Sequence, residues 1–167
     1  QVKDHKTFLQ AASLILQKHK HVQFVLAGNN VDNQNSKLTS LIVKLNLQKN
    51  IHLLGRCDNI EQLTPALDIA TCCSKSEGFA NNVGEAMSCA VPCVVTDVGD
   101  LPMIVGDTGI IVKAGIPSKL AAGWAKIIEL DSKNLEKLKQ AARNRIKKHY
   151  SMEKTIESYE QLYENIV

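Results

Sequence analysis

The 167-residue sequence lacks several features that would assign it to a specialised class of protein. It contains no apolar stretch near the roughly 18 residues of a membrane-spanning helix. Its opening residues, QVKDHKTF, do not resemble a signal peptide, so we expect no secretory leader in them. We also find no internal repeat, low-complexity segment or second-domain boundary. These absences favour one globular domain, and the 44% hydrophobic content suffices for its core.

Metal-binding and disulfide patterns are also lacking. The five cysteines are odd in number and lie mostly in apolar segments: Cys57, Cys72, Cys73, Cys89 and Cys93. No Cys-x-x-Cys or Asp-x-Asp motif occurs, and the five histidines are scattered: His5, His19, His21, His52 and His149. We therefore expect reduced thiols, no bound metal and a cytoplasmic location.

The net charge is small. The 20 Lys and Arg residues exceed the 17 Asp and Glu residues by only three, which does not indicate nucleic-acid binding. Much of the excess lies in residues 134–150, where basic and apolar positions alternate. This pattern is typical of the solvated face of an amphipathic helix and less often of a surface for acidic lipids, so peripheral association of the intact protein with the inner face of a membrane stays open.

Apolar periodicity predicts strands and helices that alternate along the chain. The predicted strands lie within residues 21–30, 51–55, 67–73, 92–97 and 108–112. The predicted helices lie within residues 8–17, 36–47, 58–67, 83–90, 118–130, 134–150 and 152–167. The strands are continuous apolar runs, which indicates a parallel sheet covered on both faces. The fold class is therefore α/β, a doubly wound, Rossmann-like parallel sheet with a helical C-terminal segment.

Short sequence patterns predict helix caps and the loops in which a ligand would bind. Asp58 and Glu61 have the spacing of a capping box, and Asp-Ser and Tyr-Ser pairs precede the last two helices. Ligands of such sheets bind beyond the carboxyl ends of the strands, where AGNN, LLGR, CCSKSEGF and TDVGD fall.

The segment SEGFANNVGEAM places Glu77 and Glu85 on either side of a glycine-containing turn that leads into a helix. One interpretation is a capping box made by Asn82 and Glu85. The other is a ligand with both phosphate and hydroxyl groups, because a helix N-terminus attracts anions and a carboxylate accepts hydrogen bonds from hydroxyls. Gly78 permits close approach of the backbone, and the N–H groups of residues 79–83 (Phe79, Ala80, Asn81, Asn82 and Val83) would point at an anion.

Five motifs in order resemble one family: Ser74, the SEGF turn, Glu-Ala-Met at 85–87, Pro-Cys-Val-Val at 92–95 and Thr-Asp-Val-Gly at 96–99. This arrangement resembles the C-terminal half of a group 1 (family 4) retaining glycosyltransferase with the GT-B fold. The resemblance runs from about Lys3 to the last helix, and Glu77 with Glu85 matches the family's Glu-x7-Glu signature.

The resemblance implies roles for individual residues. Glu77 would lie by the donor sugar, Glu85 would bind the ribose, and Lys3 would meet the donor phosphates. Arg56 would line the nucleotide base, and Gly28 would let the backbone pass close to the nucleotide. The family's arginine shortly before the lysine and the first strand of the sheet have no counterpart here, so we expect residues 1–167 to be one domain of a longer protein.

The implied function is the donor-binding half of an enzyme that transfers a sugar from a nucleoside-diphosphate sugar to an acceptor hydroxyl with retention, in polysaccharide or glycolipid synthesis. The donor is a substrate, and no cofactor or metal is expected. The implied partners are an N-terminal domain, which the last helix would contact, and an acceptor glycan or glycolipid. Residues 1–167 alone should bind the donor without turnover. Two alternatives remain: a non-catalytic nucleotide-sugar-binding module and a GT-B nucleotide-sugar epimerase.

Overall fold

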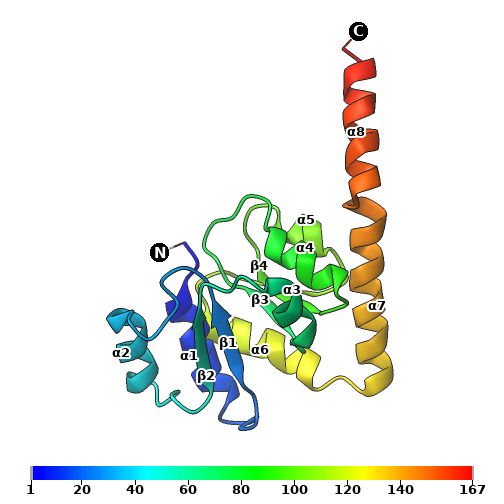
Figure 1. Cartoon of the computed structure of the whole chain (residues 1–167). Helices are drawn as coiled ribbons and strands as arrows, with labels where there is room; N and C mark the ends of the chain where they lie inside the picture. Colours follow the sequence, from blue (N-terminus) through cyan, green and yellow to red (C-terminus); the bar gives the residue numbers. More distant parts are fainter. Residues whose placement is uncertain (1, 167) are drawn as a thin grey trace.

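The computed structural model describes residues 2–166 of the chain, which alternate strands and helices. The strands are β1 (Phe24–Ala27), β2 (Ile51–Gly55), β3 (Ala70–Cys72), β4 (Cys93–Thr96) and β5 (Ile110–Val112). The helices are α1 (His5–Ile15), α2 (Ser36–Lys44), α3 (Ile60–Leu63), α4 (Asn81–Ser88), α5 (Leu101–Val105), α6 (Pro117–Ile128), α7 (Ser132–His149) and α8 (Met152–Glu164), with a 3-10 turn, η1, at Thr64–Ala66. Figure 1 shows this order.

All strand pairs are parallel, which confirms the predicted α/β class. The strands nevertheless form two hydrogen-bonded sheets, β1–β2 and β3–β4–β5. Within the described residues no ladder joins β1 to β3, so the continuous sheet that the sequence predicts is interrupted there.

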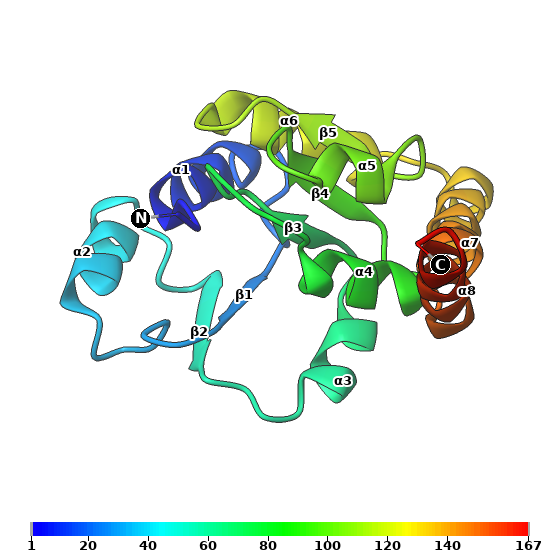
Figure 2. The same cartoon turned by 90° about the horizontal axis from the view of Figure 1, so that it is seen from above.

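Helices cover both faces of the β3–β4–β5 sheet. Helix α6 packs on one face and is itself covered by α1, whereas α4 and α5 pack on the other face with α7 behind them. All four residues of β4 are buried, as expected of a strand enclosed between two helical layers. The layers are visible end-on in Figure 2.

Most predicted element boundaries hold to within a few residues. Asp131 and Ser151 cap α7 and α8 by accepting a hydrogen bond from the backbone N–H three residues on, which confirms these two predictions. The capping box predicted at Asp58 is wrong, because α3 begins at Ile60 with no side-chain cap. Helix α5 was not predicted, because a helix of five residues shows no helical periodicity. The helix predicted within residues 58–67 is divided into α3 and η1.

Helix α8 continues α7 away from the sheets (Figure 1) and contains no buried residue. Its large apolar side chains are exposed: Met152, Ile156, Tyr159, Leu162 and Tyr163. An apolar helix surface without a covering layer agrees with the prediction of a partner domain but does not test it. No helix within residues 2–166 has the length and apolarity needed to cross a membrane.

Candidate functional site

The fold brings together Glu77 and Lys3, the two residues that the resemblance assigns to the reacting donor sugar and its phosphates as the catalytic pair, although 74 positions separate them in sequence. Lys3 Nζ lies 2.5 Å from Glu77 Oε1. The backbone carries Lys3 to this point because the Lys75 N–H donates to the Val2 carbonyl (2.8 Å), just beyond the end of β3. The carboxylate is nearly enclosed, with 12% of its side chain exposed, whereas the Lys3 side chain is 60% exposed. Lys3 is therefore able to contact both Glu77 and a ligand from solution.

The hydroxyl of a buried serine, Ser74, orients the Glu77 carboxylate. The Ser74 hydroxyl donates to Glu77 Oε1 at 2.6 Å, and Ser74 itself is 1% exposed. The Thr96 hydroxyl donates to the Ser74 carbonyl at 2.7 Å, which connects the loop to the end of β4. The sequence analysis used Ser74 only as a motif residue and gave Thr96 no structural task. The Thr96 contact joins the ends of neighbouring strands and leaves no local signal in the sequence, whereas the Ser74–Glu77 contact spans three residues of the loop after β3.

These contacts favour the charged forms of Glu77 and Lys3. Burial by itself raises the pKa of Glu77, but the hydrogen bonds from Lys3 and Ser74 outweigh burial and lower it below the ordinary 4.5. The hydrogen bond to Glu77 raises the pKa of Lys3 above its ordinary 10.5 against a smaller effect of burial. Glu77 is therefore a carboxylate at neutral pH, unsuited to act as a proton donor.

Gly99 allows the loop after β4 to approach Glu77. A Cβ atom at Gly99 would lie 1.8 Å from the Glu77 carbonyl oxygen, and its φ of +52° is in the left-handed region. Only glycine fits both conditions. The sequence analysis treated TDVGD as a marker of the fold, and the structure adds a direct contact with the backbone of the candidate site.

The N-terminus of α4 follows the SEGF turn. Helix α4 begins at Asn81, and its N-cap, Ala80, makes no side-chain cap. The Val83 N–H donates to the Ala80 carbonyl (3.0 Å), whereas no described residue accepts from the N–H groups of Asn81 and Asn82. A Cβ atom at Gly78 would meet no other atom within 4 Å, so the turn is open to solvent. These N–H groups are available to an anion.

The capping box of Asn82 and Glu85 does not form. Because α4 begins at Asn81, Glu85 lies four residues into the helix, or about 6 Å along its axis rather than the 4–5 Å that a start at Asn82 implies. Glu85 is exposed, and no side-chain partner of its carboxylate occurs among the described residues. Phe79, also exposed, packs its ring against Tyr150 at 5.7 Å between centroids.

The remaining predicted residues form a second group at the ends of β1 and β2. The Gly28 N–H donates to the Gly55 carbonyl (2.7 Å), and Gly28 has a φ of +147°. Arg56 follows β2 and donates through Nε to Asp58 at 2.9 Å, with its side chain 78% exposed. The two groups lie at the carboxyl edges of different sheets, and no strand ladder connects them in the described part of the chain.

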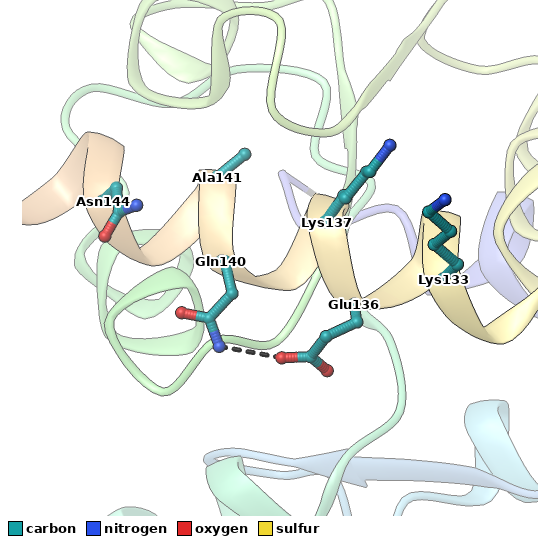
Figure 3. A pocket seen from close by; sticks show the side chains of 6 residues that line it. All are labelled: Lys133, Glu136, Lys137, Gln140, Ala141 and Asn144. Carbon is teal, nitrogen blue, oxygen red and sulfur yellow. Dashed lines mark hydrogen bonds between the residues drawn. The ribbon is translucent and has the colours of Figure 1, made fainter.

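A cavity of about 640 Å³ lies between the two sheets and is lined in part by Asn82 and Glu85. A second depression lies on the outer surface of α7 (Figure 3). Its side chains all belong to that one helix, where the Gln140 amide donates to Glu136 at 2.8 Å. None of its residues belongs to the site predicted from the sequence. In residues 2–166 no three His, Cys, Asp or Glu side chains are grouped so that they could hold a metal.

The comparison with protein families agrees with this arrangement. A family model described as "Glycosyl transferases group 1" matches residues 1–130, which is most of the chain. The chain belongs to the group 1 glycosyltransferase family. Transferase chemistry is therefore the activity of its family, and the predicted membership is confirmed.

Three relatives illustrate the similarity. N-acetyl-alpha-D-glucosaminyl L-malate synthase of Bacillus anthracis is 27% identical over 132 residues, which are 78% of this chain and 34% of the relative. The C-terminal domain of a group 1 family protein, LpcC, from Francisella tularensis is 26% identical, with a TM-score of 0.78 over 90% of this chain and 81% of that chain. Anabaena HepE, solved in complex with UDP, is 22% identical, with a TM-score of 0.84 over 98% of this chain and 45% of that chain. The chain spans about a third of the length of the curated relatives it matches.

Proposed function

We propose that residues 1–167 form the donor-binding domain of a glycosyltransferase that uses a nucleoside-diphosphate sugar. The observation that carries this proposal is the Lys3–Glu77 pair beside the open N-terminus of α4. A cation and unpartnered helix N–H groups suit a diphosphate, and a fixed carboxylate suits sugar hydroxyls. The match to an isolated C-terminal domain supports the domain assignment, and the UDP complex of Anabaena HepE supports the ligand class.

Each site residue has a task in this proposal. The N–H groups at the start of α4 bind the diphosphate, Glu85 accepts from the ribose hydroxyls, and Glu77 faces the donor sugar. Lys3 has three donors on its ammonium group, so it can hold Glu77 and a phosphate oxygen together. It also separates two negative groups that would otherwise repel each other. As the bond to the sugar breaks, charge grows on the departing diphosphate, and a fixed cation stabilises that charge.

The proposal also covers the stereochemistry of transfer, the acceptor, and the location and partner domain of the intact protein. Transfer proceeds with retention to an acceptor hydroxyl of a glycan or glycolipid, within polysaccharide or glycolipid synthesis. The donor is a substrate and no cofactor or metal takes part. The intact protein is cytoplasmic, and an N-terminal domain that contacts α8 completes the active site, so residues 1–167 alone bind donor without turnover. The basic surface of α7 is the part suited to association with the inner membrane face.

Calorimetric titration of residues 1–167 with UDP, GDP and ADP tests the ligand class. We expect one of the three to bind, and Glu85→Ala to weaken it about 10- to 150-fold, which corresponds to the loss of hydrogen bonds to a charged group worth about 1.5–3 kcal/mol. Glu160→Ala is the matched control, an exposed helical glutamate on α8 away from the sheets. Absence of binding by all three nucleotides, or equal affinities of the Glu85→Ala variant and the parent, would refute the site.

Transfer and binding assays of the intact protein distinguish a transferase from a non-catalytic binding module. We expect Glu77→Ala to abolish transfer while the nucleotide sugar still binds, because Glu77 acts on the sugar and the diphosphate is held elsewhere. A non-catalytic module would show no transfer in the parent either. An epimerase would convert the nucleotide sugar to its epimer without any acceptor, which chromatography of the reaction mixture detects.

A further inference from the structure

The junction between α7 and α8 lies beside the turn that leads into α4. Helix α7 ends at His149, Tyr150 is its C-cap, and α8 begins at Met152. Figures 1 and 2 both place α4 and α5 next to α7, and these three helices pack against one another. The Tyr150 side chain is partly buried and packs on the apolar cluster that α4 and α5 share. The C-terminal helices therefore reach the candidate donor site through this one ring.

The ring of Tyr150 packs against the ring of Phe79, which lies in the SEGF turn. The ring centroids are 5.7 Å apart and the ring planes are inclined at 57°. Favourable aromatic pairs have centroids about 4.5–7 Å apart, and such a pair is worth a factor of about 2–12 in an equilibrium constant. Because Phe79 is 50% exposed, this contact is a substantial part of what holds its side chain in place.

The hydroxyl end of Tyr150 is fixed by α5. The Tyr150 hydroxyl donates to the Met103 carbonyl at 3.1 Å. The Arg145 guanidinium donates to the same carbonyl at 2.6 Å and to the Ile104 carbonyl at 2.8 Å. A Cβ atom at Gly106 would lie 2.4 Å from Arg145 Cζ, so the guanidinium lies directly against the backbone that ends α5. The end of α5 thus supports both the last turn of α7 and the Tyr150 ring.

The segment that begins with Gly99 and continues into α5 also contacts the SEGF turn on its other side. Gly99 lies two residues before α5, and a Cβ atom there would lie 1.8 Å from the Glu77 carbonyl oxygen. Between these two contacts the turn has little packing, since a Cβ atom at Gly78 would meet no other atom within 4 Å. The contact on the Phe79 ring is therefore well placed to determine where the backbone enters α4.

We propose that Tyr150 is a positioning residue of the donor site, whose ring holds Phe79 and thereby sets the spacing between the Glu77 carboxylate and the N–H groups at the start of α4. This inference rests on the proposed function, in which Glu77 faces the donor sugar and α4 binds the diphosphate. Those groups meet two parts of one donor molecule, so a change in their spacing weakens binding. In this role Tyr150 acts through Phe79 and not on the donor itself.

Amide exchange at the start of α4, followed by NMR, tests the contact without any ligand. The N–H groups of Val83 and Gly84 donate to the Ala80 carbonyl at 3.0 and 3.4 Å, so they report the geometry where the turn enters the helix. We expect Tyr150→Ala to speed their exchange by about 2- to 12-fold. Tyr150→Phe keeps the ring and loses the hydroxyl, so its exchange should stay within about twofold of the parent.

Further variants separate this contact from a general loss of stability. Tyr159→Ala is the matched control, because Tyr159 is an exposed tyrosine of α8 whose ring stacks on Tyr163, and it should leave exchange at Val83 as in the parent. Phe79→Ala breaks the same contact from its exposed side and remains informative if Tyr150→Ala does not fold. In the Phe79→Ala background, Tyr150→Ala should have no further effect at Val83, because a double-mutant cycle isolates the pair.

Calorimetric titration extends the test to the donor site. The parent and the variants are titrated with UDP, GDP and ADP. We expect Tyr150→Ala and Phe79→Ala each to weaken the nucleotide that the parent binds by about 2- to 12-fold, and Tyr150→Phe to retain the affinity of the parent.

Four outcomes would overturn the proposal. They are parent-like exchange at Val83 and Gly84 in both alanine variants, an undiminished effect of Tyr150→Ala in the absence of the Phe79 ring, equal effects of Tyr150→Phe and Tyr150→Ala, and nucleotide affinities of both alanine variants equal to that of the parent. The last outcome refutes the positioning role while the proposed function stands. Absence of nucleotide binding by the parent itself refutes the proposed function, and the role of Tyr150 toward a donor with it, even if exchange changes as expected.

Discussion

Replacement of Ser74 by alanine removes the buried hydroxyl that orients Glu77. The hydrogen bond of 2.6 Å reaches a carboxylate of which 12% is exposed, and bonds to charged groups contribute about 1.5–3 kcal/mol. The Lys3–Glu77 pair contributes less, about 0–1 kcal/mol, because Lys3 is 60% exposed and screened by water. We therefore expect Ser74→Ala to lower the free energy of unfolding by about 1.5–3 kcal/mol at pH 7.

The effect of Ser74→Ala on the free energy of unfolding at two pH values tests whether the Ser74 hydroxyl acts through the charge of Glu77. The pKa of Glu77 is lowered in the folded state, so the stabilisation of its charge is complete above the ordinary value of 4.5 and is lost as pH falls through the folded pKa. The difference between parent and variant should therefore shrink at pH 3. Urea unfolding followed by circular dichroism measures it, as a midpoint shift of about 1 M at pH 7 for a slope of about 2 kcal/mol/M.

Ser88→Ala is the control for this experiment, because the Ser88 hydroxyl lies exposed on α4 and donates only to the Glu85 carbonyl. Its stability should change little, since alanine is the better helix former. A loss in Ser74→Ala that is the same at both pH values would show that the hydroxyl acts through packing and not through the Glu77 charge. A change no larger than that of Ser88→Ala would refute the argument.

Three further predictions concern separate features. Gly99→Ala should cost more than the ~1–2 kcal/mol of left-handed strain, because its Cβ would meet the Glu77 carbonyl; a smaller loss in urea unfolding would mean that the loop relaxes freely. Burial raises the pKa of Cys73 and of Cys93 to about 12, so at pH 8 both should react with a thiol reagent at least ~1000-fold slower than in urea, and rapid native labelling would contradict their burial. Ser151→Ala should speed amide exchange in α8 about fivefold, for a cap worth about 1 kcal/mol; an equal effect of alanine at an interior serine of α8 would exclude capping.

The success of the sequence predictions depends on how far apart in the sequence the interacting residues lie and on the conformation of the loops that carry them. The caps at Asp131 and Ser151 were predicted correctly because a cap joins residues three positions apart. The capping box at Asp58 failed although its letters match, because the chain there starts its helix two residues later. Spacing permits a cap, but the surrounding loop decides where the helix begins.

The candidate site shows the same division. The Glu-x7-Glu pattern drew attention to Glu77 and Glu85, and a resemblance, not spacing, placed Lys3 with them. The close approach of Gly99 could not be predicted, because it depends on how the loops after β3 and β4 meet. The hydrogen bond from Ser74 spans only three residues of the loop after β3, but the conformation of that loop decides whether it forms. The roles of these residues toward a nucleotide sugar remain predictions.

The sequence by itself determined the α/β class and the family, because apolar runs, helical periodicity and ordered motifs are local properties of the chain. Only the tertiary structure decided that Lys3 and Glu77 are paired and that the parallel strands form two sheets with a cavity between them. The physical reason is that a strand edge or an ion pair is completed by residues far away in sequence. A local sequence pattern therefore does not show whether those distant residues are in contact.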